Sequence, residues 1–156
     1  MSENLKPLAK CCDQYSHELA NLESVSIDRI VEIADEVGFF LVKGKYLKNN
    51  KPDSMGIKVN QIRRFLDAVR RIEARLKESK SKESKSKEIT EEIKGSIILL
   101  RPKLAYAAGR EEKIKPLMNV LDPAIKSGAE SKENFEKLLR LIEGIIAYHR
   151  YHGGSN

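Results

Sequence analysis

Helical periodicity is the feature of this sequence that most limits its fold. Along most of the chain, apolar residues recur three and four positions apart, which is the spacing of one face of an α-helix. No stretch alternates apolar and polar residues as a half-buried strand would. The sequence therefore predicts an all-α protein, a compact bundle of five or six helices. The length of 156 residues predicts a single helical domain over residues 1–156.

Turn residues divide the first third of the chain. One helix is expected at about residues 5–22 and a second at about residues 26–48, with Ser26 as its N-cap. Asn, Pro, Asp and Gly within residues 49–56 predict a loop there.

A third helix carries an apolar stripe from Ile62 to Leu76. Five arginines lie off that stripe: Arg63, Arg64, Arg70, Arg71 and Arg75. A charged helix face is often only solvated, but few acidic residues accompany these arginines, which favours an arginine surface with a partner. The Lys/Ser-rich segment 77–88 follows and has no apolar residue. We expect it to be flexible, either as a loop or as a frayed extension of the helix.

Prolines interrupt the helical pattern in the second half. The pattern resumes at Glu88, and Pro102 predicts either a kink or a new helix with this proline in its first turn. A shorter helix at 111–127 is expected to be interrupted near Pro116 and Pro123. The last helix begins around Ser131, and His149 falls on its apolar seam, where we expect a packed or hydrogen-bonded histidine.

The stretch LLRPKLAYAAGR, residues 99–110, places cations around small residues. Lys103, Tyr106 and Arg110 share one helix face by their spacing, and we expect Leu104, Ala107 and Ala108 on the other side. Tyr106 either packs or stacks on a nucleic-acid base. The small residues would let another chain approach closely.

Charge is unevenly distributed along the chain. Residues 1–57 hold 7 Lys/Arg and 9 Asp/Glu, residues 58–110 hold 15 and 7, and residues 111–156 hold 7 and 7. The middle third therefore carries a net charge of +8 in a chain whose total is +6, so all of the excess positive charge lies there, which favours an anionic partner such as nucleic acid.

Several classes of function find no support in the sequence. Cys11 and Cys12 are adjacent, and His149 and His152 lack further ligands, so neither pair predicts a metal site. No phosphate-binding glycine loop or hydrolase motif appears, so we expect no cofactor and no catalysis by this chain. No apolar run approaches a membrane span and no secretory signal is evident, so a cytoplasmic location without membrane association is expected.

Three segments resemble the small subunit of the Csm complex, the type III-A CRISPR-Cas effector. They are the helix start QIRRF (61–65), LRPKLAYAAGR (100–110) and the C-terminal IEGIIAYHRYHGG (142–154), and with the helices between them they cover about 95 residues. The chain departs from the family pattern at Lys58-Val59-Asn60, where a threonine cap is common, and at Gly144, where alanine is usual.

The resemblance implies a non-catalytic helical subunit that is present in several copies. Such subunits stack into a filament beside the backbone subunits that hold the CRISPR RNA, and they touch the large polymerase-like subunit. The filament lines the channel for the guide–target RNA duplex, and RNA cleavage belongs to the backbone subunits. The implied partners are CRISPR RNA, target RNA, these subunits and further copies of the chain.

A subunit that accepts any guide sequence should contact the RNA backbone, because phosphate contacts carry no sequence information. We therefore predict that cations of the middle third join in one groove: Arg63, Arg64, Arg70, Arg71, Arg101, Lys103 and Arg110. Arginine suits this role through paired, charge-assisted hydrogen bonds to phosphate. An alternative is a helical protein–protein adaptor without a nucleic-acid role. A helix-turn-helix DNA regulator is a further alternative, but the short helix and tight turn of that motif are missing.

Overall fold

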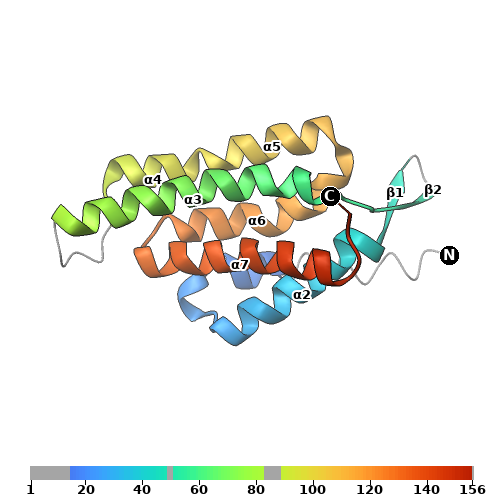
Figure 1. Cartoon of the computed structure of the whole chain (residues 1–156), viewed down its shortest axis with the longest axis horizontal. Helices are drawn as coiled ribbons and strands as arrows, with labels where there is room; N and C mark the ends of the chain where they lie inside the picture. Colours follow the sequence, from blue (N-terminus) through green and yellow to red (C-terminus); the bar gives the residue numbers. More distant parts are fainter. Residues whose placement is uncertain (1–14, 49–50, 83–88, 156) are drawn as a thin grey trace.

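Within the residues that the structure describes, the six helices α2 to α7 lie in a layered arrangement, which confirms the predicted all-α bundle. The computed structural model describes residues 15–48, 51–82 and 89–155. Figure 1 shows α4 and α5 along one edge, α2 along the opposite edge, and α3, α6 and α7 between them. The helices are α2 (Ile27–Lys43), α3 (Val59–Lys82), α4 (Glu91–Ile98), α5 (Leu100–Arg110), α6 (Lys115–Gly128) and α7 (Lys132–Tyr151), with short 3-10 helices η2 (Leu22–Ser24) and η3 (Glu112–Ile114).

Helix α7 occupies the centre of the packing, since α2, α3 and α6 all contact it. It begins where the sequence predicted: Ser131 is the N-cap, and its hydroxyl accepts a hydrogen bond from the backbone N–H of Asn134 at 3.1 Å. Ser26 caps α2 in the same way, accepting from Arg29 N–H at 3.1 Å. The apolar seam of α7 is buried through Phe135, Leu138, Leu139, Ile142 and Ile145.

Two glycines set the distance between α2 and α7. A Cβ on Gly38 of α2 would lie 2.8 Å from the backbone nitrogen of His149 and 2.9 Å from Cβ of Tyr148. A Cβ on Gly144 of α7 would lie 2.8 Å from Cβ of Ala34. Real Cβ atoms essentially never approach other atoms so closely, so each helix needs a glycine where its backbone meets the other.

A short hairpin replaces the end of the second predicted helix and the loop after it, so those two predictions were wrong. Helix α2 stops at Lys43, where the chain turns to extended backbone at Gly44. A Cβ at position 44 would collide with the ring of Phe40, so this turn needs glycine. Strands β1 (Lys45–Lys48) and β2 (Lys51–Ser54) then pair antiparallel, with Lys45 opposite Ser54. Charged and turn residues dominate both strands, so the sequence lacks the alternation of apolar and polar residues that indicates a strand.

Of the two alternatives predicted for Pro102, a kink or the first turn of a new helix, the structure shows the second. The helical path breaks at Leu99, and Pro102 stands in the first turn of the new helix α5, where its missing N–H would have no helical partner.

The predicted interruption of the 111–127 helix near Pro123 is wrong. Pro116 lies in the first turn of α6, and Pro123 lies within the helix, which continues to Gly128. A proline at this place leaves the carbonyl four residues earlier, that of Asn119, without its helical donor. The hydroxyl of Ser16 donates to that carbonyl at 2.9 Å and supplies the missing hydrogen bond.

The C-terminal residues close over the start of α3. His149 is fully buried, and its Nε2 hydrogen-bonds to the carbonyl of Ile57, which confirms the prediction of a packed histidine. Gly154 lies against the imidazole ring so closely that a Cβ would collide with it. One residue further, the carbonyl of Ser155 accepts from the backbone N–H of Val59 at 2.9 Å, which fixes the first turn of α3.

Two predicted segments are described only in part. Residues 15–19 are helical and bury Tyr15 and Leu19, as expected for the 5–22 helix, whose earlier residues lie outside the described part. Helix α3 runs on to Lys82, so residues 77–82 extend that helix, and residues 83–88 lie outside the described part. Within the described ranges, no helix has the length and apolar character needed to cross a membrane.

Substituting Gly38 tests the close approach of α2 and α7. Gly38→Ala should lower the free energy of unfolding by about 1–3 kcal/mol, because the added methyl group forces the two helices apart. Gly95→Ala is the matched control, since a Cβ at this site in α4 meets nothing within 4 Å. It should raise stability by about 0.5–1 kcal/mol through the higher helix propensity of alanine. Urea unfolding measures both, and equal effects would contradict the packing argument.

Candidate nucleic-acid interface

Helix α3 carries its arginines on different sides. Its apolar stripe faces the core, where Ile62, Leu66 and Val69 are buried. Arg64 lies toward α5 and Arg70 lies toward α7. The helix starts at Val59 although the family's usual threonine cap is absent. The side-chain oxygen of Gln61 accepts from the N–H of Lys58 at 3.0 Å, which is one half of a capping box.

A groove lies between α3 and α5, which run side by side in Figure 1. It has a volume of about 570 Å³. Its walls combine cations with aromatic and small side chains. They include Gln61, Arg64, Phe65 and Ala68 from α3; Lys103, Leu104, Tyr106, Ala107 and Arg110 from α5; and Asn60, Glu111 and Ile114 at one end.

Three cations in the groove are free of ion pairs within the described part of the chain. Arg64, Lys103 and Arg110 are exposed, and none of them forms a salt bridge there. Arg110 lies over the ring of Tyr106, with its guanidinium carbon 5.9 Å from the ring centroid, which is a cation–π contact. The carboxylate of Glu111 accepts from the N–H of Lys113 at 3.4 Å, so it caps η3. The groove is therefore a positively charged surface.

The predicted shared face of α5 is confirmed. Lys103, Tyr106 and Arg110 line the groove, and Ala108 is buried on the core side as expected. Leu104 is buried but also borders the groove, and the prediction for Ala107 was wrong, because it lines the groove. Tyr106 is 69% exposed, so the prediction that it packs is wrong.

The small residues of α5 divide between core and surface. Ala108 packs in the core, Ala107 lines the groove, and nothing lies within 4 Å of a Cβ built on Gly109. Another chain can thus come close to the backbone of α5 at this point.

Arg101 faces away from the groove. Its Nε and one terminal nitrogen donate to the two carboxylate oxygens of Asp122 on α6, at 2.8 and 3.1 Å. The hydrogen bond to Asp122 raises the pKa of Arg101 above its already high ordinary value. Two parallel bonds of this kind fix both side chains, so Arg101 joins α5 to α6.

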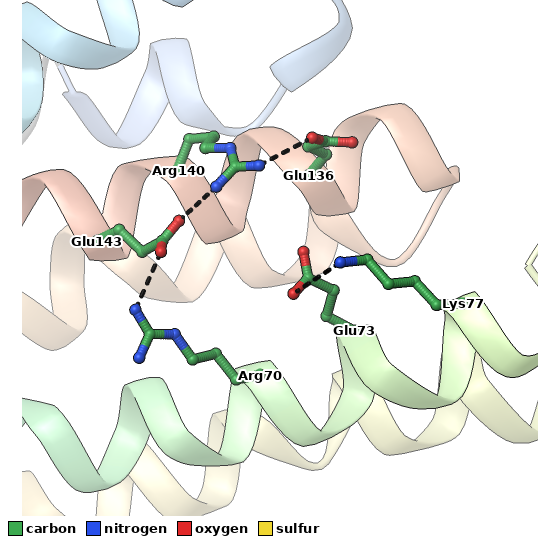
Figure 2. A network of polar contacts seen from close by, with 6 residues as sticks. All are labelled: Arg70, Glu73, Lys77, Glu136, Arg140 and Glu143. Atoms are coloured by element: carbon green, nitrogen blue, oxygen red, sulfur yellow. Dashed lines mark hydrogen bonds and ion pairs between the residues drawn. The ribbon is translucent and has the colours of Figure 1, made fainter.

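Arg70 belongs to a chain of ion pairs between α3 and α7, drawn in Figure 2. Its guanidinium donates to Glu143 at 3.0 Å, and the other oxygen of Glu143 accepts from Arg140 at 2.7 Å. Arg140 also reaches Glu136 at 3.2 Å. Burial alone raises the pKa of Glu143, but the bonds from the two arginines outweigh burial and hold this pKa below its ordinary value of 4.5.

The structure brings three of the seven predicted cations together and separates the other four. Arg64, Lys103 and Arg110 meet in the groove. Arg70 and Arg101 are held by carboxylates, and Arg63 and Arg71 are exposed on α3 outside the groove lining. Arg71 is seven residues after Arg64, so it continues the same side of α3 about 10 Å further along.

Sequence reasoning missed the groove residues that carry no charge. Gln61, Phe65 and Ala68 line the α3 wall. Their spacing of three and four, along the edge of the apolar stripe, is the signal that could have found them. Metal binding was not expected, and among the described residues no group of three or more His, Cys, Asp or Glu side chains could hold a metal ion.

The pair of Arg101 and Asp122 should stabilise the fold. Each side chain is more than a third exposed, at 37% and 36%, so solvent screening limits the interaction to about 0.5–1 kcal/mol. A double-mutant cycle with Arg101→Ala and Asp122→Ala, followed by urea unfolding, measures this coupling. The coupling free energy should be smaller in 1 M salt, because salt screens the two charges. Additive single effects would show that the pair does not stabilise the protein.

Acid should weaken the contact between α3 and α7. Because the pKa of Glu143 is depressed in the folded protein, the carboxylate contributes stability at pH values above about 4.5 and loses it as pH falls through the folded value. Glu143→Gln should therefore destabilise the protein more at pH 7 than at pH 3, as measured by urea unfolding. Glu36→Gln, at an exposed position of α2, is the control and should change the free energy of unfolding little. A constant effect of Glu143→Gln across pH would contradict the assignment.

Comparison with known proteins gives one clear match. The family model described as Csm2 Type III-A matches residues 24–155, which includes the groove, the three motif segments and the whole of α2. No curated protein matches the chain. Since the family model covers most of the chain, the protein belongs to the Csm2 family of type III-A, the small subunits of the Csm complex.

Proposed function

We propose that this chain is a non-catalytic small subunit that stacks in several copies and binds the backbone of the guide–target RNA through the α3–α5 groove. Its partners would be CRISPR RNA, target RNA, the backbone subunits, the large polymerase-like subunit and copies of itself, in the cytoplasm. The family match supports the proposal that this chain belongs to a Csm complex. The α3–α5 groove is the surface through which we propose that it binds RNA.

One observation carries the proposal: the cations of the groove are unpaired while neighbouring arginines are paired. Arg70, Arg75 and Arg101 each donate to a carboxylate of another helix. Arg64, Lys103 and Arg110 converge from two helices without such a partner within the described ranges. Three like charges that line one groove, with Glu111 as the one carboxylate among the described lining residues, repel one another, so an anionic ligand would stabilise this arrangement.

The spacing of these cations suits a polymer of phosphates. Arg64 and Arg71 are seven residues apart on α3, and so are Lys103 and Arg110 on α5, which is about 10 Å along each helix. Two rows of cations along neighbouring helices can contact several phosphates without reading bases. Tyr106 adds an exposed aromatic ring beside the rows, where one base can stack in any sequence.

RNA binding by the purified chain tests the proposal. Fluorescence anisotropy with RNA of arbitrary sequence, over a salt series, should show binding that weakens steeply as salt rises. The Arg64→Ala, Arg110→Ala double variant should bind more weakly and should lose about 1.5 units of the log–log salt slope, because two phosphate contacts disappear.

Two control variants separate the groove from charge in general. Lys43→Ala removes an exposed cation at the end of α2 and should leave affinity within about twofold. Arg101→Ala removes an arginine that is engaged by Asp122 and should affect stability more than RNA binding. Equal affinity of the double groove variant and the wild type at every salt concentration would contradict the proposal. Capture of a protein partner without any RNA binding would favour the adaptor alternative.

A further inference from the structure

The outer face of α2 is apolar and acidic. Val31, Glu32, Asp35 and Phe39 lie three, four, seven and eleven positions after Asp28, so they share one face with it, opposite the buried side of the helix. Val31 is 44% exposed and Phe39 is 48% exposed, so two large apolar side chains face outward beside the carboxylates. Asp35 bonds to His152 at 2.6 Å and Glu32 to Arg29 at 3.0 Å, while Asp28 has no ion pair within the described ranges.

The outer face of the α4–α5 elbow is apolar and basic. Leu99, Pro102, Lys103 and Tyr106 line a shallow hollow of about 470 Å³. Leu99 is 60% exposed and Tyr106 is 69% exposed. Lys103 gives this lining a positive charge, and it forms no ion pair within the described ranges. Helix α5 contains no acidic residue, and its Arg101 is paired with Asp122. This elbow, defined by Leu99, Pro102, Lys103 and Tyr106, is therefore complementary in charge to the outer face of α2.

These two faces cannot meet within one molecule. Figure 1 places α5 and α2 at opposite edges, with α3, α6 and α7 between them. Each face combines exposed apolar side chains with charge of one sign. Because the two faces lie at opposite edges of the molecule, each could bury its apolar side chains only against another chain. The complementary face of a second copy offers both an apolar surface and the opposite charge.

We propose that the outer face of α2 in one copy docks on the α4–α5 elbow of the next copy. Such a contact joins two different surfaces, so it leaves one free face at each end and continues into an open stack. The inference rests on the proposed stacking of several copies and names the surfaces through which they meet. Lys103 and Tyr106 border both the elbow hollow and the groove, so each docked copy lies beside the groove of its neighbour.

Charge reversal on each face tests the contact. The α2 variant carries Asp28→Lys and Glu32→Lys, and the elbow variant carries Lys103→Glu. Sedimentation velocity of the purified full chain, over a range of concentrations, should show wild-type assemblies that grow beyond dimers. Either variant alone should associate at least about tenfold more weakly, because like charges then face each other. A one-to-one mixture of the two variants should regain association, because every docking face then meets opposite charge.

Several outcomes would overturn the docking. The docking proposal is wrong if the wild-type protein stays monomeric up to millimolar concentration. It is also wrong if the assemblies stop at a dimer. Single variants that associate like the wild type, or a mixture that fails to recover, would have the same consequence. Circular dichroism of each variant confirms that it is folded.

Arg64→Ala separates this inference from the proposed RNA groove, because it changes the groove and neither docking face. It should keep wild-type association while RNA affinity falls. If RNA affinity falls but charge reversal leaves association unchanged, the docking surfaces are wrong and the groove stands. If charge reversal acts as expected but Arg64→Ala binds RNA like the wild type, the stack stands and the groove assignment fails.

Discussion

The close contact between α2 and α7 is the constraint on which the remaining structure depends. Gly38 and Gly144 let the two backbones approach, and the apolar seam of α7 then reaches α3 and α6 as well. Because α7 contacts three other helices, its position fixes the direction of α3, and through α3 one wall of the groove. The usual alanine of the family is replaced by glycine at position 144, where Ala34 of α2 leaves no room for a methyl group. Packing density thus accounts for a departure that looked arbitrary in the sequence.

The structure divides a basic chain into cations that hold the fold and cations that face outward. Arg29, Arg70, Arg75, Arg101 and Arg140 each bond to a carboxylate. These pairs join α3 to α7, α3 to α4 and α5 to α6, so they tie the outer helices to the centre. Arg64, Lys103 and Arg110 line the groove and form no ion pair within the described ranges. A count of arginines along a helix cannot make this distinction, because the counter-charge comes from a different helix.

Patterns within one helix predicted well, and contacts between helices did not. Ser26 and Ser131 were found as caps, and the two faces of α5 followed from spacing, because each depends on residues within a few positions. The pairing of Arg101 with Asp122 spans 21 residues, and that of Arg70 with Glu143 spans 73, so neither can be read from periodicity. Pro123 was expected to interrupt its helix, and the hydroxyl that rescues the freed carbonyl comes from Ser16, which is 103 residues from Asn119. The hairpin after Gly44 was missed because its strands are charged and lack alternation.

The backbone bond from Val59 to Ser155 has a consequence for the order of folding. The first turn of α3, close to Arg64, is completed by the carbonyl of Ser155, which is 96 residues further along the chain than Val59. The nearby carbonyl of Ile57 forms a hydrogen bond with the imidazole of His149. Contacts between residues so far apart in sequence form late, because the entropy of closing a long loop must be overcome first. The groove wall on α3 therefore gains its final backbone geometry only when α7 has docked. A nascent chain that still lacks α7 would display the arginines of α3 without a fixed groove wall.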